Sequence, residues 1–156
     1  MRLQKLVVVR HGCYDDTGLT EQGRRHIAQL AETLAQRLND HAVALLSSPL
    51  KRAMETSEII AARLGLNFDE HPCLLSGGYR LNNGQVEATL RLIAERSETY
   101  TAIILSTHLE FVEKFPSLWG ATHGFLIAQE ENVLKGTARV VDVQTGQVEI
   151  LHPPWA

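Results

Sequence analysis

The sequence predicts a three-layer α/β/α fold built on a mainly parallel sheet. Short apolar runs alternate along the chain with segments that repeat apolar residues at helical spacing. The last two apolar runs flank a Thr-Gly pair, which is typical of an antiparallel hairpin. We therefore expect helices on both faces of the sheet and a C-terminal hairpin at one of its edges.

The first strand and helix are the clearest elements of the N-terminal region. Residues 3–9 are rich in Val and Leu, which favours a buried strand. Thr20 can accept a hydrogen bond from the start of a helix, and apolar residues continue at helical spacing to about residue 39. The sequence therefore predicts a strand, a loop and a helix that starts after Thr20.

A second strand and helix follow the same pattern. Residues 42–46 form a short apolar run that ends in Ser47-Ser48-Pro49. Proline is favoured at the first position of a helix and serine at its cap, so we expect the helix to start at Pro49 with Ser48 as its cap. Gly65 is the expected end of this helix.

The second half of the chain continues the alternation. Pro116 interrupts the apolar stretch at 109–119, which is therefore predicted to be only partly helical. The other expected elements are an extended stretch over 66–73, a helix over 85–97, a strand over 101–106, and hairpin strands over 137–143 and 147–151.

The composition indicates a globular protein without a nucleic-acid or membrane partner. The 156 residues (1–156) are expected to form one domain, and 44% hydrophobic with 21% charged residues argues against disorder. A net charge of −3 and scattered Lys and Arg give no nucleic-acid footprint. The two cysteines have no metal or disulfide spacing, and the N-terminal apolar run is too short for a leader or membrane span. These features predict a cytoplasmic protein, and they make no prediction of its oligomeric state.

Three predicted strand ends carry the residues with chemical potential. Arg10, His11 and Gly12 follow the first strand, the second strand leads to Arg52, and His108 follows the third. The carboxyl ends of parallel strands meet at one edge of a sheet, where ligands usually bind. Two arginines and two histidines gathered there would make a cationic cup rich in hydrogen-bond donors, which suits a phosphoryl group.

Four stretches of the chain resemble the histidine phosphatase superfamily, which includes the phosphoglycerate mutases. In the order that the family shows, they are residues 6–12 (LVVVRHG), 19–24 (LTEQGR), 47–57 (SSPLKRAMETS) and 103–108 (IILSTH). In size and pattern the chain is most similar to the small bacterial phosphohistidine phosphatases. The resemblance implies a phosphoglycerate mutase-like fold with the C-terminal edge hairpin, and a hydrolase of the phosphatase class.

The resemblance also implies roles for the matching residues. His11 would attack phosphorus and become a phosphohistidine, while Arg10 and Arg52 would bind the equatorial oxygens. His108 would donate a hydrogen bond to the transferring group. Thr17 falls where relatives often place a polar phosphate ligand.

No carboxyl group matches the general acid of the larger relatives convincingly. Glu70, Glu110 and Asp15 are the candidates for a possible acid that protonates the leaving group. Phosphohistidine needs less assistance, because it can depart as neutral imidazole when its other ring nitrogen already carries a proton. The lack of a clear match to that general acid therefore favours a protein phosphohistidine or a small phosphomonoester as substrate.

Three functions follow from this pattern. The first is a metal-independent phosphatase that acts through phospho-His11, with no cofactor and no metal, because no residue pair has the spacing of a zinc motif. The second is a phosphoglycerate mutase-like phosphotransferase or a broad phosphomonoesterase. The third is a non-catalytic domain that binds a phosphorylated ligand.

Overall fold

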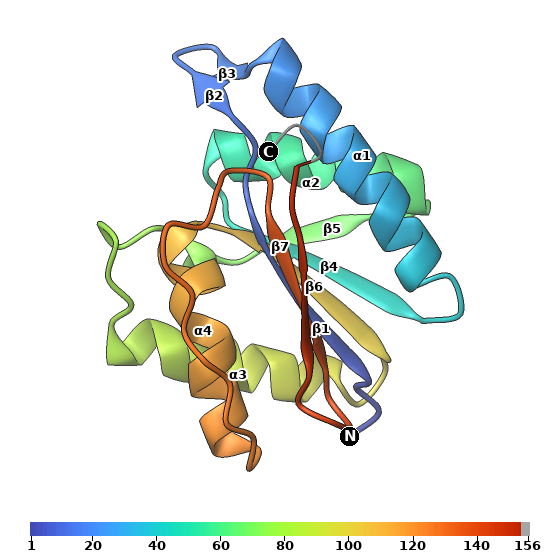
Figure 1. Cartoon of the computed structure of the whole chain (residues 1–156), viewed down its shortest axis with the longest axis vertical. Helices are drawn as coiled ribbons and strands as arrows, with labels where there is room; N and C mark the ends of the chain where they lie inside the picture. Colours follow the sequence, from blue (N-terminus) through green and yellow to red (C-terminus); the bar gives the residue numbers. More distant parts are fainter. Residues whose placement is uncertain (154–156) are drawn as a thin grey trace.

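A computed structural model describes residues 1–153 of the chain. Within this range six strands form one sheet in which β5, β4, β6 and β1 run parallel, and β7 and β8 form an antiparallel hairpin at the β1 edge (Figure 1). Their order across the sheet is β5 (Phe68–Glu70), β4 (Val43–Ser47), β6 (Ala102–Thr107), β1 (Lys5–Arg10), β7 (Ala138–Asp142) and β8 (Val148–Leu151).

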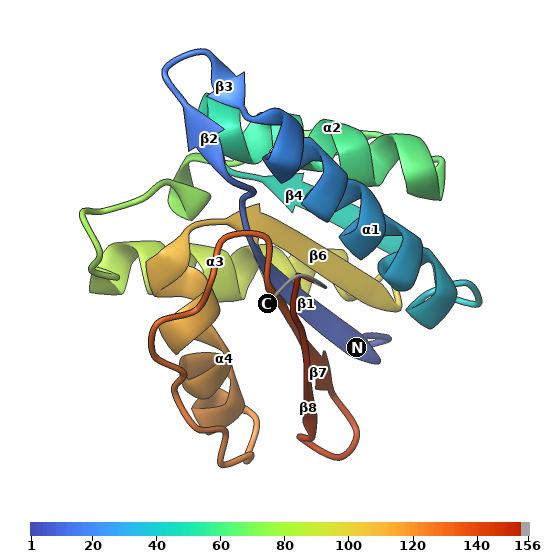
Figure 2. The same cartoon turned by 45° about the horizontal axis from the view of Figure 1, so that its top comes forward.

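The helices lie in two layers, one on each face of this sheet (Figures 1 and 2). The first layer contains α1 (Glu21–Arg37) and α2 (Lys51–Leu64), and the second contains α3 (Asn83–Arg96) and α4 (Leu109–Thr122). The arrangement confirms the predicted three-layer α/β/α fold and its edge hairpin.

Strand β1 shows why the sheet is buried on both faces. Successive side chains of a strand point to opposite faces, so Val7 and Val9 join the core under α1 and α2, while Leu6 and Val8 join the core under α3 and α4. All four are fully buried. An unbroken apolar run is the pattern expected for a strand covered by helices on both sides.

The predicted ends of the first two helices are partly correct. Thr20 caps α1 by accepting a hydrogen bond from the Gly23 N–H at 3.0 Å, and Gly65 ends α2 with a φ of 70°, where glycine is favoured. The prediction for the start of α2 was wrong, because the helix begins at Lys51 and Leu50 is its cap. Ser48 is fully buried instead, and its hydroxyl contacts a histidine described below.

Helix α4 corrects another prediction, because Pro116 lies inside a continuous helix. Proline has no N–H to donate to the carbonyl four residues earlier, which here belongs to Val112. Arg139 of β7 donates to that oxygen from Nη1 at 3.0 Å, and the same Nη1 lies 3.2 Å from the backbone carbonyl oxygen of Glu113. Its Nη2 donates to Ala128 O at 2.8 Å. This guanidinium, which is almost fully buried, therefore compensates for the proline and ties the segment after α4 to the helix.

Four short elements lie in regions that the sequence did not resolve. Strands β2 (Tyr14–Asp15) and β3 (Gly18–Leu19) form a small hairpin in the predicted loop after β1. The predicted extended stretch at 66–73 contains only the three residues of β5, and the turn η1 (Pro72–Leu74) follows.

Over residues 1–153, no helix combines the length and apolar character needed to cross a membrane.

We expect the substitution Arg139→Met to lower the free energy of unfolding by roughly 3 kcal/mol, because it removes the donor to the buried Val112 carbonyl of α4 and to carbonyls of Glu113 and Ala128. Urea denaturation measures this loss. Pro116→Ala restores an N–H for Val112 O, so the double variant should lose about 1 kcal/mol less than the sum of the single changes.

The surface pair of Arg63 and Glu32 provides the control for this experiment. Arg63→Met removes an exposed ion pair and should cost less than about 1 kcal/mol. Strictly additive losses at positions 116 and 139 would contradict the proposed compensation.

Candidate active site

The carboxyl ends of β1, β4 and β6 meet where the candidate residues lie. In the pairing of β1 with β6, Arg10 lies opposite Thr107, and the His11 N–H donates to Thr107 O at 3.1 Å. His11 and His108 therefore leave neighbouring strands at the same level, and their ring centroids are 5.4 Å apart. Both rings are nearly inaccessible to solvent, with 3% and 2% of the residue exposed.

Two contacts hold the His11 ring. Its Nδ1 lies 3.0 Å from Gly12 O, a carbonyl that can only accept, so Nδ1 carries the proton. Its Nε2 is then the acceptor for the Arg52 Nε–H at 3.1 Å. Burial, together with the charges of Arg52, Arg10 and Lys135, lowers the pKa of His11 to about 4. The ring is therefore neutral near pH 7, with the Nε2 lone pair directed toward a cation.

His108 is the cap residue of α4 and is also held neutral. Its Nε2 lies 2.7 Å from the hydroxyl oxygen of Ser48, while its Nδ1 has no hydrogen-bond partner among the described residues. Burial, followed by the proximity of His11, Arg52 and Arg10, lowers the pKa of His108 to about 3. A neutral imidazole still has one N–H to donate, so the ring can contact an anion without being charged.

Arg10 reaches the site from the end of β1. Its Nη1 donates to Val133 O at 2.5 Å, and its Nε is buried without a partner in the described part of the chain. Burial lowers the pKa of this guanidinium, and the negative charge of Glu113 acts against that shift. Arg10 is therefore a partly desolvated cation, and it attracts an anion more strongly than it would in water.

Arg52 lies in the first turn of α2, and hydroxyl groups hold that turn against the strands. Thr56 accepts from the Gly12 N–H at 3.1 Å and donates to the Arg52 carbonyl at 2.8 Å. Ser106 of β6 donates to Ala53 O at 3.1 Å. These bonds fix the position of Arg52 relative to His11, and they explain why the buried position 56 of α2 carries a hydroxyl group.

Tyr14 forms one wall of the site. Its ring centroid lies 5.2 Å from that of His11, in an edge contact, and 4.8 Å from the Arg52 Cζ. The Lys135 Nζ lies 5.0 Å from the same centroid. One aromatic ring therefore contacts the candidate nucleophile and lies close to two cations.

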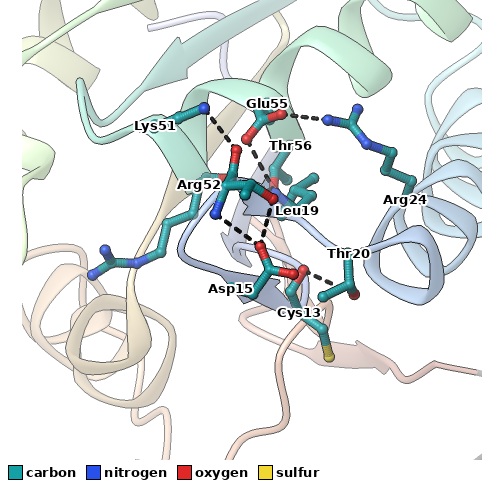
Figure 3. A network of polar contacts seen from close by, with 10 residues as sticks. Cys13, Asp15, Leu19, Thr20, Arg24, Lys51, Arg52, Glu55 and Thr56 are labelled. Atoms are coloured by element: carbon teal, nitrogen blue, oxygen red, sulfur yellow. Dashed lines mark hydrogen bonds and ion pairs between the residues drawn. The ribbon is translucent and has the colours of Figure 1, made fainter.

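The β2–β3 hairpin that carries Tyr14 is anchored to α2, as Figure 3 shows. Glu55 accepts from the Leu19 N–H at 3.1 Å and also pairs with Arg24 of α1. The Lys51 Nζ donates to Thr17 O at 2.7 Å. These contacts attach the hairpin to the helix that supplies Arg52.

Thr17 and Asp15 are occupied within this hairpin. The hydroxyl and the N–H of Thr17 both donate to the Asp15 Oδ1, at 2.7 and 2.9 Å, and both side chains are exposed. This placement argues against the predicted phosphate contact of Thr17. The same hydrogen bonds lower the pKa of Asp15, which argues against Asp15 as the general acid.

Glu70 and Glu110, the other acid candidates, lie in contrasting positions. Glu70 is exposed at the end of the edge strand β5, and β4 and β6 separate it from β1, roughly 14 Å away at three strand spacings. Glu110 is 1% exposed in the first turn of α4, and neither of its carboxylate oxygens has a hydrogen-bond partner among residues 1–153. Only Glu110 thus combines burial with a position close to His108 in the chain.

Sequence reasoning missed four residues that contact or lie close to the site. Ser48 and Thr56 lie in a stretch that is rich in hydroxyl residues between the end of β4 and the first turns of α2, and that richness is a local signal for such anchors. Tyr14 and Lys135 had no comparable signal, because one lies on a short hairpin and the other follows α4 by a long loop.

The arrangement can bind and transfer a phosphoryl group. A neutral imidazole offers a lone pair, and Arg10, Arg52 and Lys135 surround it with positive charge that can stabilise an anionic transition state. In the part of the chain that the structure describes, no group of three His, Cys, Asp or Glu residues could hold a metal ion.

Comparison with known families confirms the resemblance seen in the sequence. The family model of the histidine phosphatase superfamily (branch 1) matches residues 6–76, a little under half of the chain. The match includes the strand that ends at Arg10, the candidate nucleophile His11 and the helix that carries Arg52. Comparison with curated protein sequences found no match.

Solved structures of phosphatases share the fold over nearly their whole length. The protein histidine phosphatase SixA, solved with tungstate, has a TM-score of 0.70 at 20% identity and covers 94% of each chain. A putative phosphohistidine phosphatase SixA from Agrobacterium tumefaciens has a TM-score of 0.63 at 17% identity, with 95% of each chain covered. A mycobacterial glucosyl-3-phosphoglycerate phosphatase has a TM-score of 0.64 at 18% identity, covering 94% of this chain and 97% of its own. These likenesses establish the fold, and with the family match they support a hydrolase of the phosphatase class.

The two buried histidines predict a loss of stability in acid. Their folded pKa values of about 4 and about 3 lie below the ordinary value of 6.5, so protonation favours the unfolded chain. The two neutral rings contribute fully to the free energy of unfolding above pH 6.5, and this contribution is lost as the pH falls toward 4. Between pH 7 and pH 5 each should remove about 2 kcal/mol from the free energy of unfolding.

Urea denaturation at the two pH values measures this effect. The double variant His11→Gln/His108→Gln should show a much smaller decrease than the unmodified protein, whereas the exposed control His152→Gln should not differ from it. An equal pH dependence in all three proteins would contradict the assignment of neutral, buried rings.

Proposed function

On the premise of the superfamily match at residues 6–76, we propose that this chain is a metal-independent phosphatase that forms a phosphohistidine at His11. Its substrate is a protein phosphohistidine or a small phosphomonoester. The observation that carries the proposal is the state of His11: its Nδ1 is tied to Gly12 O, and its neutral ring turns the Nε2 lone pair toward Arg52. Binding alone would not require a nucleophile in this state.

The reaction has two steps that both pass through His11. The Nε2 lone pair attacks phosphorus, a P–N bond forms, and the bond from phosphorus to the leaving oxygen or nitrogen breaks with its electron pair. Water then attacks phosphorus, and the electron pair of the P–N bond returns to Nε2. An alkoxide leaving group takes up a proton in the first step, and a proton from the attacking water replaces it in the second. An imidazole whose other nitrogen already carries a proton leaves without taking one up.

Arg52 must change partners during the first step. Without substrate, its Nε–H occupies the Nε2 lone pair of His11 at 3.1 Å, and attack requires that this hydrogen bond break. A phosphoryl oxygen offers the guanidinium a stronger, charge-assisted acceptor than a neutral imidazole does. Substrate binding therefore exposes the nucleophile as it engages the arginine. Arg10 and the N–H of His108 are the proposed donors to the remaining oxygens.

Metal independence is part of the proposal because side-chain cations lie where charge develops. At about 4 Å and an effective dielectric constant of 20, a unit charge pair is worth about 4 kcal/mol before desolvation. Two such cations, Arg10 and Arg52, can supply much of the stabilisation that phosphoryl transfer needs.

Phosphohistidine is the preferred substrate because its departure needs the least assistance from a general acid. Departure of neutral imidazole requires no strong acid, and the contacts of Asp15 and the distance of Glu70 argue against both as proton donors. The buried Glu110 favours the second candidate, a broad phosphomonoesterase or mutase-like enzyme, since a buried carboxyl group two residues after His108 could protonate an alcohol if it reaches the leaving group.

We expect His11→Ala to abolish phosphatase turnover and the formation of a phosphoenzyme. Incubation with a phosphodonor, an alkaline quench and mass spectrometry should place acid-labile phosphate on His11 of the unmodified protein. Arg52→Gln should slow turnover by about 10²–10³-fold through the loss of a preorganised donor. Full turnover by His11→Ala would overturn the mechanism. Phosphate-dependent binding without any phosphoenzyme would instead support a non-catalytic domain.

The leaving group tests the role of Glu110. If Glu110 is the acid, Glu110→Gln should reduce turnover of an alkyl phosphate by about 10²-fold or more, but should affect p-nitrophenyl phosphate far less, because its leaving group needs little protonation. Glu70→Gln is the matched control and should not change the ratio of the two rates. Equal loss on both substrates would indicate a structural role for Glu110 and favour the phosphohistidine substrate.

A further inference from the structure

Lys135 is a third cation at the site, and the proposed reaction steps assign it no ligand. It precedes Gly136, whose N–H is shared by Arg10 O at 3.1 Å and His11 O at 2.9 Å. These backbone bonds tie the lysine to the residues that carry the chemistry. Its charge acts on His11 in the same direction as the two arginines do.

The ring of Tyr14 is shared by Lys135 and Arg52. The Lys135 Nζ and the Arg52 Cζ lie 5.0 and 4.8 Å from the centroid of the same ring, within the range of cation–π attraction. Tyr14 is 40% exposed, so the ring stands at the rim of the site while His11 lies at its base. Lys135 is half-buried, which leaves its ammonium group partly open to solvent at this rim.

The three cations of the site have no carboxylate partner among residues 1–153, although several cations elsewhere do. Five arginines form ion pairs with carboxylates at the surface, namely Arg24, Arg25, Arg37, Arg63 and Arg96. Within residues 1–153, Arg10, Arg52 and Lys135 form none. The protein thus leaves three unpaired cations around one nucleophile, next to two neutral histidines.

The charge of one phosphoryl group does not match this cluster. A phosphomonoester carries about −1.5 to −2 near pH 7, whereas the three cations together carry a charge of +3, and Glu113 acts on Arg10 without forming an ion pair with it. Arg10 and Arg52 are the proposed ligands of the phosphoryl oxygens, and they balance that charge. Lys135 remains for a negative group elsewhere on the substrate.

We propose that Lys135, positioned by Tyr14, binds a second anionic group that lies next to the phosphoryl group of the substrate. The inference rests on the proposed phosphatase function and narrows its substrate class to phosphorylated compounds with a neighbouring carboxylate or phosphate. An ammonium on a flexible stem suits this role, since it acts as a point charge with rotatable donors and does not require one geometry of its ligand.

Binding of two small ligands tests the inference without requiring turnover. Phosphoglycolate has a carboxylate next to its phosphoryl group, and methyl phosphate has none. Calorimetry should show that the unmodified protein prefers phosphoglycolate. Lys135→Met should weaken phosphoglycolate binding by about tenfold, a typical effect of one charge-assisted contact, and should weaken methyl phosphate binding much less. Lys135→Arg should retain most of the preference.

Two sets of variants complete the test. Lys114→Met removes the same charge from α4, away from Tyr14, and should preserve the preference. Tyr14→Leu should reduce the preference for phosphoglycolate and Tyr14→Phe should keep it, because Lys135 contacts the aromatic ring and not the hydroxyl group. An equal loss for both ligands in Lys135→Met would place the lysine on the phosphoryl group itself and overturn the inference. An unchanged preference would overturn it as well.

The source of the second anion is distinguished by a second pair of ligands. A phosphohistidine peptide with Glu beside the modified residue should be hydrolysed faster than the same peptide with Gln if the anion comes from a protein substrate. Equal rates, together with a Lys135-dependent preference for phosphoglycolate, would assign it to a small molecule. Failure to detect phospho-His11 would overturn the proposed function, yet the ligand preference would still test the lysine.

Discussion

The register between β1 and β6 is the constraint on which the site depends. The pairing of Arg10 with Thr107 and the hydrogen bond from His11 N–H to Thr107 O bring two residues from distant parts of the chain to the same level. A shift by one residue would turn the alternate side chains of β1 to the opposite face. The fully buried Val7 and Val8 lie in opposite cores, so such a shift would disrupt the core as well as the site. Core packing and catalytic geometry are thus determined by the same pairing.

The site is held together largely by neutral groups, and this leaves its charges available. His11 is fixed by the Gly12 carbonyl, His108 contacts the Ser48 hydroxyl, and Arg10 donates to the Val133 carbonyl. Carboxylates in these places would orient the cations as well, but they would also neutralise them and compete with an anionic substrate. Hydroxyl and carbonyl groups orient side chains without that competition, which is the arrangement that electrostatic stabilisation of a phosphoryl group requires.

The C-terminal part of the chain completes a site whose main residues come from the other strands. Arg139 holds the segment after α4 by bonding to Val112 and Ala128, and the Gly136 N–H attaches the end of that segment to β1. Figure 2 shows this segment returning alongside α4 to the end of β1. Val133 and Lys135 reach the site in this way. The proline in α4 contributes indirectly, because the carbonyl that it leaves without a helical donor accepts a hydrogen bond from Arg139.

Local patterns determined much of the fold and the set of candidate residues. Helical spacing and the Thr20 and Gly65 signals depend on interactions within a few residues, so they predicted α1 and the end of α2 correctly. The order of strands and helices was sufficient to expect His11, Arg52 and His108 at one edge of a sheet, and the structure brings them together.

Only the tertiary structure decided which partner each polar side chain takes. Ser48 has the sequence signature of a helix cap but is buried against His108, and Pro116 has that of a helix break but is compensated by Arg139. Lys135 has no signature at all. The physical reason is the same in each case: these contacts join residues 27 to 121 positions apart, and no pattern within a short segment encodes which distant group will contact a given side chain.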